Sequence, residues 1–272
     1  MSNGKRIALS LALLLACGNL PAQDERIIEW VEDAPASDDS VIALGYPVPI
    51  PVNTPLPFAG FRTYNGLHMR HQDLAATTAW VHPHEIGQAH NGSTIWAYQL
   101  GDPDRETWRG HPEPAMLTNG GIHAREWQSP EVATGIIELL ATAADNPLVD
   151  YLRENANIIV IPVLNVEGFQ QTQRFPDQSW MGTDPDDPDF SPRDGRMRRK
   201  NMRDVDEEIE TQSDHLFGVD LNRNNSPYWA HNPNRSSSDP ASIVHHGVSA
   251  KSEGEIQALV AAVQLGPVAQ LS

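Results

Sequence analysis

One run of residues, 157–164 (Asn-Ile-Ile-Val-Ile-Pro-Val-Leu), constrains the fold of this chain more than any other. The run is almost continuously apolar and rich in β-branched side chains, which is the pattern of a strand buried on both faces. Such a strand lies inside a sheet that helices cover on each side. The sequence therefore favours an α/β domain.

Shorter patterns around this run predict strands and helices in alternation. Strands are expected at 93–100, 114–122 and 217–221, and helices at 67–80 and 252–263. This alternation favours a mainly parallel or mixed central sheet with helices on both faces.

Two helix starts carry local signals. One helix is expected to begin at Ser129-Pro130-Glu131, because Ser at the N-cap, Pro at the first position and an early acid favour a start there. The helix at 252–263 is expected to open with a capping box between Ser252 and Glu255. The apolar face of the first helix is predicted to be Val132, Ile136, Leu139 and Leu140.

Residues 1–22 have the pattern of an export signal. Lys5 and Arg6 precede an apolar run, 7–16, that is shorter than the roughly 20 residues of a membrane-spanning helix. Two processing routes stay open: acylation of Cys17 after a lipobox-like Leu-Leu-Ala, or ordinary signal-peptidase cleavage after Gly18 or Ala22. We expect an exported protein, either secreted or periplasmic, or anchored by lipid at Cys17, with no transmembrane segment in the mature chain.

Composition narrows the remaining choices. Residues 23–60 are acidic and proline-rich, which predicts a linker or extended arm before a domain at 61–272. The 19 Lys and Arg against 36 Asp and Glu give a formal charge of −17, so nucleic acid is a poor partner. Cys17 is the only cysteine, so any metal in the domain must be held by imidazole and carboxylate.

The densest chemical signal is Gly-Gly-Ile-His-Ala-Arg-Glu-Trp at 120–127, between a predicted strand and a predicted helix. In a helical or tight turn, side chains three residues apart can converge, so His123 and Glu126 could share one metal ion. The motif His-x-x-Glu is common by chance, however, and a surface His beside a surface Glu is the alternative.

Three ordered motifs resemble those of the M14 zinc metallocarboxypeptidases. They are Gly-Ile-His-Ala-Arg-Glu-Trp at 121–127, Arg-Met-Arg-Arg-Lys-Asn at 196–201 and Gly-Val-Asp-Leu-Asn-Arg-Asn at 218–224. The resemblance covers about 64–272. It implies that 61–272 is a partial zinc carboxypeptidase catalytic domain, and that the protein removes C-terminal residues from peptides or proteins with a free C-terminal carboxylate.

The resemblance also implies roles for single residues. His123 and Glu126 would be two of three Zn²⁺ ligands, and Asp220 would accept the other ring N–H of His123. Arg199 would stabilise the oxyanion that forms during hydrolysis. Three further residues would bind substrate: Asn222 and Arg223 at its C-terminal carboxylate, and Arg125 near the adjacent subsite.

The resemblance places the family's third zinc ligand, its general-base Glu and its specificity pocket beyond Ser272, and it implies that the central sheet is incomplete at the C-terminus. We therefore expect an inactive fragment, which would be either an incomplete sequence or a truncated product. Two alternatives stay open: a non-catalytic module that binds carboxylates or peptides, and a small-molecule deacylase related to M14.

Overall fold

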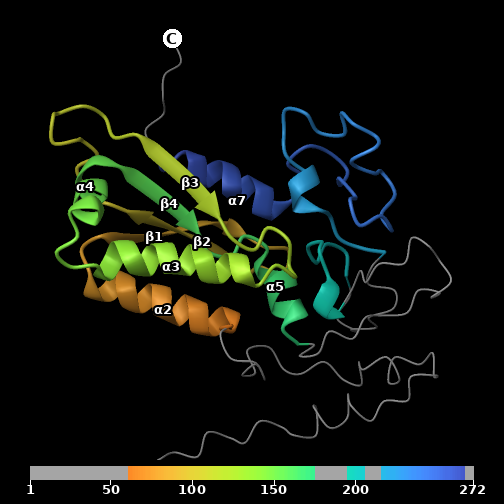
Figure 1. Ribbon diagram of the computed structural model, residues 1–272. Helices are drawn as coiled ribbons and strands as arrows, with labels where there is room; N and C mark the ends of the chain where they lie inside the picture. The colour runs from red at the N-terminus through yellow and green to blue at the C-terminus, as the bar shows by residue number, and fades with distance from the viewer. Residues whose placement is uncertain (1–60, 175–194, 206–215, 267–272) are drawn as a thin grey trace, which may run out of the picture.

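The computed structural model describes residues 61–174, 195–205 and 216–266, which form a four-stranded sheet between helices (Figure 1). The predicted export signal, 1–22, and the predicted arm, 23–60, lie outside the described residues. No single helix in the described ranges is long and apolar enough to span a bilayer, and one pair bent by 96° passes that test only by length and composition.

The sheet is mixed, which is one of the two types that the sequence left open. Its order is β1-β2-β4-β3; β2 pairs antiparallel with both β1 and β4, and β3 runs parallel to β4. The parallel pair matters most for function because both strands end at the same edge of the sheet. The strands are β1 (Val81–Gln88), β2 (Thr94–Leu100), β3 (Ala115–Asn119) and β4 (Asn157–Ile161).

Helices cover both faces of this sheet (Figure 1). Successive residues of β4 point to opposite faces, as its continuously apolar sequence predicted. Ile158 and Val160 pack in one cluster with the helix α3, whereas Ile159 and Ile161 pack in another with α7. The helices are α2 (Tyr64–Thr77), α3 (Gln128–Thr142), α4 (Pro147–Asn155), α5 (Val166–Thr172) and α7 (Gly254–Val263), with short 3₁₀ turns η1 (Gly195–Met197) and η2 (Leu221–Arg223).

The predicted strand at 217–221 is wrong. This segment is irregular and leads into η2, because its backbone pairs with a loop and not with the sheet. The Asn201 N–H donates to the Val219 carbonyl, and the Val219 N–H donates to the Asn201 side chain at 2.8 Å. Gly218 has φ +85°, a left-handed conformation that breaks an extended run.

The start of α3 differs from the prediction. The helix begins one residue before Ser129, whose hydroxyl accepts from Gly121 N–H and donates to the Glu126 carbonyl. Ser129 therefore ties the helix to the preceding loop and does not act as an N-cap. The buried face is also rotated: Val132 and Leu139 are exposed, whereas small Ala133 lets the helix approach the sheet.

The predicted capping box of α7 is also wrong. Glu253 is the N-cap residue, and the Ser252 hydroxyl donates to the Glu253 carboxylate at 2.6 Å. The buried carboxylate of Glu255 accepts hydrogen bonds from the Asn201 side chain at 3.2 and 3.3 Å. The Ser252 hydroxyl is thus bonded to Glu253 and the Glu255 carboxylate to Asn201, so Ser252 and Glu255 do not form the capping box.

Burial of Glu255 makes stability depend on pH. Burial raises the pKa of Glu255 to about 7, against 4.5 for an exposed carboxyl, and the nearby charge of Glu253 adds to this rise. The folded state therefore keeps a proton that the unfolded state loses, and this contribution to stability disappears as the pH rises from 4.5 through 7. Over this pH range, the free energy of unfolding of the parent should fall by about 2–3 kcal/mol more than that of Glu255→Gln, because the variant has no carboxyl group to titrate at this position.

Urea unfolding measured between pH 4.5 and 8 tests this expectation. Glu154→Gln, an exposed substitution in α4, is the control and should keep the parental pH dependence. An equal slope for Glu255→Gln and the parent would contradict the expectation.

Candidate functional site

The site is built on the loop that follows β3. The Gly120 N–H donates to the Ile161 carbonyl at the end of β4, and Leu164 N–H donates back to the Gly120 carbonyl. A Cβ at position 120 would lie 2.5 Å from the Pro162 carbonyl oxygen, so only glycine fits. Gly121 has φ +60°, which turns the chain toward His123. The motif lies between a strand and a helix, as predicted, at the end where the parallel strands β3 and β4 both stop.

His123 and Glu126 lie together in this loop. His123 Nδ1 is 2.8 Å from Glu126 Oε1, and the Glu126 N–H donates to the His123 carbonyl, which closes the turn between them. The imidazole is buried, whereas 44% of the Glu126 side chain is exposed. The predicted close approach of the two side chains is confirmed, and their role as metal ligands stays a prediction.

Asp220 lies on the other side of the same imidazole. Its Oδ1 is 3.2 Å from His123 Nε2, and its Oδ2 accepts from Arg199 Nε at 3.0 Å. The Asn222 N–H also donates to Oδ1, at 3.0 Å. The predicted contact between Asp220 and His123 is confirmed. Asp220 does not, however, reach it from the end of a neighbouring strand as expected, but from the irregular segment before η2.

The Asp220 carboxylate is fully buried and charged. Burial alone would raise the pKa of this carboxyl, but the hydrogen bond with His123 and the charge of Arg199 outweigh burial and hold the pKa below its usual range. An ionised Asp220 favours the imidazole tautomer with its N–H on Nε2. That tautomer leaves the lone pair of Nδ1 directed toward Glu126.

These donors fit a zinc ion. Neutral imidazole nitrogen and carboxylate oxygen are both zinc ligands, and two ligands of a tetrahedral ion lie about 3.4 Å apart. The half-exposed Glu126 carboxylate can move outward by the few tenths of an ångström that this requires. Within the described ranges, no third His, Asp or Glu joins the pair, since the one group of three such residues that could hold a metal is Asp102, Asp104 and Glu113.

Arg199 and Arg125 approach the pair from two directions. Arg199 Nη1 lies 4.0 Å from Glu126 Oε1, so its guanidinium spans the distance between Glu126 and Asp220. Arg125 Nη1 donates to the Met197 carbonyl, and burial together with the charge of Arg199 lowers its pKa. The guanidinium groups of both arginines therefore lie close to the candidate zinc ligands.

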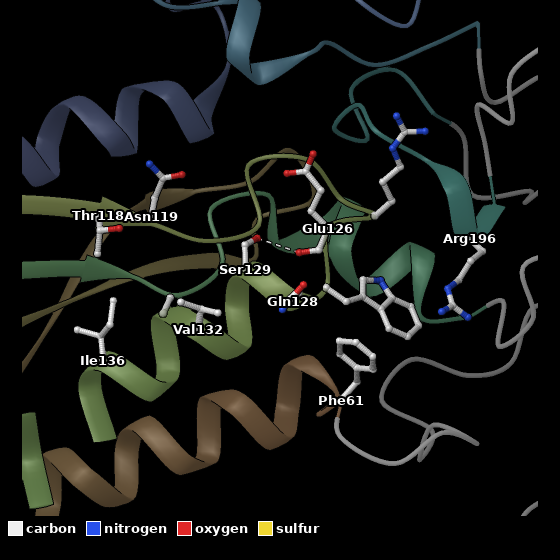
Figure 2. A pocket seen from close by; sticks show the side chains of 12 residues that line it. Phe61, Thr118, Asn119, Glu126, Gln128, Ser129, Val132, Ile136 and Arg196 are labelled. Carbon is white, nitrogen blue, oxygen red and sulfur yellow. Dashed lines mark hydrogen bonds between the residues drawn. The ribbon is translucent and has the colours of Figure 1, made fainter. Parts of the chain in front are cut away.

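A hollow of about 710 Å³ opens next to Glu126 (Figure 2). Val132 and Ile136 of α3 give it an apolar side, and Arg125 and Glu126 give it charge. Its floor includes Trp127, whose ring lies 4.0 Å from the guanidinium carbon of Arg196. No local pattern in the sequence signals that Arg196 stacks on Trp127, because the two residues are far apart in the chain.

Asn222 and Arg223 line a different hollow, of about 400 Å³, together with His231 and Arg235. Arg223 Nε donates to the Arg235 carbonyl at 2.8 Å and lies 4.0 Å from Asp220 Oδ2. The roles that the resemblance implies for His123, Arg199, Asn222 and Arg223 require all four to reach one bound substrate, which stays a prediction. Neither hollow is lined by His123 or Arg199, yet Arg199 and Arg223 both approach Oδ2 of Asp220, at 3.0 and 4.0 Å.

Comparison with known proteins decides the family. The model of the family described as zinc carboxypeptidase, Peptidase_M14, matches residues 71–269. This chain belongs to the zinc carboxypeptidase family. Its three motifs at 121–127, 196–201 and 218–224 all lie inside the matched range.

Curated zinc carboxypeptidases support this assignment. Mast cell carboxypeptidase A of Homo sapiens is 27% identical over 176 residues, which cover 64% of this chain and 34% of that protein. Zinc carboxypeptidase A 1 of Anopheles gambiae is 27% identical over 215 residues, which cover 77% and 40%. The chain thus spans about a third to two fifths of the length of these two relatives.

Two solved structures share the fold. Carboxypeptidase A from Helicoverpa armigera has a TM-score of 0.55 at 24% identity, over 87% of this chain and 47% of that one. Thrombin activatable fibrinolysis inhibitor has a TM-score of 0.57 at 19% identity, over 89% and 50%. The predicted α/β architecture of the zinc carboxypeptidases is therefore confirmed.

The Asp220 network makes a prediction about the stability of this zinc carboxypeptidase domain. Asp220→Ala leaves the buried imidazole of His123 and the guanidinium of Arg199 without their shared acceptor. We expect a loss of about 3 kcal/mol in the free energy of unfolding. Urea unfolding in metal-free buffer measures it.

Glu126→Ala is the matched control, because Glu126 contacts the same His123 from a half-exposed position. It should cost less than about 1 kcal/mol. Equal losses for the two variants would show that the buried network does not stabilise the domain.

Proposed function

We propose that this chain carries part of the active site of a zinc-dependent metallocarboxypeptidase, which hydrolyses the C-terminal residue from peptides or proteins. The observation that carries the proposal is the alignment Glu126–His123–Asp220. A metal-binding imidazole needs one nitrogen toward the ion and the other toward an acceptor, and His123 has a partner of the right kind on each side.

In this proposal His123 Nδ1 and the Glu126 carboxylate hold Zn²⁺, and Asp220 fixes the tautomer and orientation of the imidazole. Bound zinc would supply Lewis-acid polarisation of the scissile carbonyl and a lower pKa for a bound water. Because the Asp220 carboxylate is fully buried and bonded to His123 Nε2, it would keep the imidazole ring turned with Nδ1 toward the metal.

Arg199 is the residue proposed to stabilise the oxyanion. Its Nε is held by Asp220, so the side chain needs no reordering before it can donate to a developing negative charge. Its Nη1 faces the candidate zinc ligands, as the distance of 4.0 Å to Glu126 shows. A preorganised donor of this kind acts on the charge that appears in the transition state.

Asn222 and Arg223 are proposed to bind the C-terminal carboxylate of the substrate, with Arg125 at the adjacent subsite. A guanidinium can meet both carboxylate oxygens with its planar fork of N–H donors. The position of Arg223 supports this role: it is partly exposed, it lines a hollow, and it lies next to the residue that orients His123. Selection for a free C-terminus is what makes such a peptidase an exopeptidase.

Zinc binding tests the ligand assignment. We expect titration calorimetry on the chain to detect zinc binding that His123→Ala abolishes, and that Asp220→Asn weakens by about 10- to 100-fold. His84→Ala is the matched control, because His84 lies on β1, where its ring contacts the Gln99 side chain. Equal zinc affinity in His123→Ala and His84→Ala would overturn the assignment.

The carboxylate clamp is tested with paired peptides of the same sequence, one with a free C-terminus and one amidated. We expect Arg223→Ala to weaken binding of the free peptide by about tenfold or more and to leave the amidated peptide unchanged. Fluorescence anisotropy measures both affinities. Arg109→Ala, beside Trp108, is the control; an equal loss for both peptides in Arg223→Ala would remove the clamp.

The two alternatives from the sequence are outcomes of these tests. A chain that binds the free peptide through Arg223 but binds no zinc would be a non-catalytic carboxylate-binding module. A chain that binds zinc but does not distinguish the two peptides would fit a small-molecule deacylase better.

A further inference from the structure

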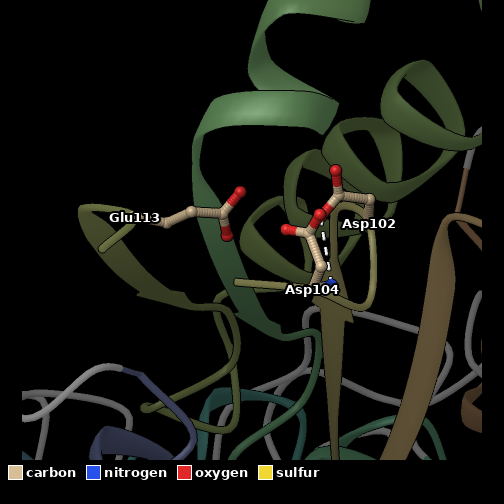
Figure 3. A group of neighbouring side chains, drawn as sticks. All are labelled: Asp102, Asp104 and Glu113. Atoms are coloured by element: carbon tan, nitrogen blue, oxygen red, sulfur yellow. Dashed lines mark hydrogen bonds between the residues drawn. The ribbon is translucent and has the colours of Figure 1, made fainter. Parts of the chain in front are cut away.

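Three carboxylates converge in the connection between β2 and β3, before the strand whose other end leads to His123 (Figure 3). Asp102 and Asp104 follow β2, and Glu113 lies two residues before β3. One oxygen atom from each of the three side chains lies within 4.8 Å of the other two. The proposed peptidase site uses none of them.

Glu113 is the unusual member of this group. Only 2% of the residue is exposed, and its Oε1 is buried with no hydrogen-bond partner in the part of the chain that the structure describes. Burial, together with the charges of Asp102 and Asp104, raises the pKa of its carboxyl. Figure 3 shows the Glu113 carboxyl facing those of the two aspartates. A buried polar atom without a partner costs free energy, so this oxygen is aimed at something that the protein side chains do not supply.

The backbone fixes the two aspartates opposite it. Asp102 Oδ1 accepts from Asp104 N–H at 3.3 Å, and Asp104 Oδ1 accepts from Glu106 N–H at 2.8 Å. The Glu113 N–H donates to the Arg105 carbonyl at 3.2 Å, which ties the two sides of the loop together. Among the described residues, no ion pair neutralises these carboxylates; the charge of Arg105 acts on Glu113 only as the weakest influence on its pKa.

We propose that Asp102, Asp104 and Glu113 bind one Ca²⁺ ion. The donors are all carboxylate oxygens, which suit hard cations, and neither His nor Cys is present to favour zinc or copper. Oxygen ligands lie about 2.3–2.6 Å from Ca²⁺, so ligands on opposite sides of one ion are about 5 Å apart. The mutual spacing in this group is within that limit.

Calcium would have a structural effect in this position. The ion would join the two ends of the β2–β3 connection and remove the repulsion among three like charges. The same connection is anchored to α4, because Asp102 N–H donates to the Arg153 carbonyl and Trp108 N–H donates to the Asn155 side chain. We therefore expect bound Ca²⁺ to stabilise the whole domain.

The test uses the full chain after removal of metals with EGTA. Calorimetric titration with CaCl₂ should show one bound ion, and the unfolding temperature should rise by several degrees in millimolar CaCl₂ and less in MgCl₂. Asp104→Asn and Glu113→Gln should each weaken Ca²⁺ binding by about tenfold or more and lose the rise in unfolding temperature. Glu113→Gln should unfold at a higher temperature than the parent without calcium, because it removes a buried charge.

Glu85→Gln is the control, since Glu85 is an exposed acid on β1, at the opposite edge of the sheet from β3. It should keep the full response to calcium. If Glu113→Gln does not fold, exposed Asp104→Asn carries the test. Any one of three results would overturn the proposal. The parent chain binds no Ca²⁺, the variants bind Ca²⁺ as tightly as the parent, or Mg²⁺ binds as tightly as Ca²⁺.

Discussion

The buried charge of Asp220 is the interaction on which the site depends. A carboxylate without solvent must be neutralised and hydrogen-bonded. Arg199 supplies the positive charge, and His123 and Arg199 both donate hydrogen bonds to it. This single requirement draws together a loop after β3, the segment around residue 199 and the start of η2. Their relative positions are therefore set by electrostatics in a buried space, and not by the hydrogen bonds of the sheet.

The sheet supplies the platform for that network. β3 and β4 run parallel and end together, and the two glycines at 120 and 121 let the next residues pass close to the end of β4. The chain then turns back through His123 into α3, where Ser129 holds the first turn against the loop. Backbone geometry thus fixes His123 and Glu126, while Asp220 fixes the side-chain orientation of His123.

The domain places several acids out of solvent although the chain is strongly acidic. Glu253 is paired with Arg203 at 2.7 Å, and Asp220 is paired with Arg199. Within 61–174, 195–205 and 216–266, no Lys or Arg forms an ion pair with Glu255 or Glu113, and burial raises the pKa of each. A bound proton neutralises Glu255 up to near neutral pH, and a calcium ion neutralises Glu113 in our proposal. The same physical cost therefore has two different chemical solutions in one fold.

Local pattern was enough for much of the fold. The apolar run at 157–164 predicted a strand buried on both faces. Its first five residues form β4 (Asn157–Ile161), and all five are buried. The spacing of His123 and Glu126 predicted their contact, since a turn of three residues is a local property. The motif resemblance also led to the correct family.

Other features were decided only by tertiary structure. The segment at 217–221 has the composition of a strand, yet Asn201 takes its backbone hydrogen bonds. Ser252 and Glu255 have the spacing of a capping box, yet Glu253 and Asn201 take their side chains. The candidate calcium site could not be predicted from the sequence around Glu113, because only folding buries its Oε1 and brings it close to Asp102 and Asp104. Sequence thus determined what each segment can form locally, whereas competition among distant partners for buried hydrogen bonds decided what it does form.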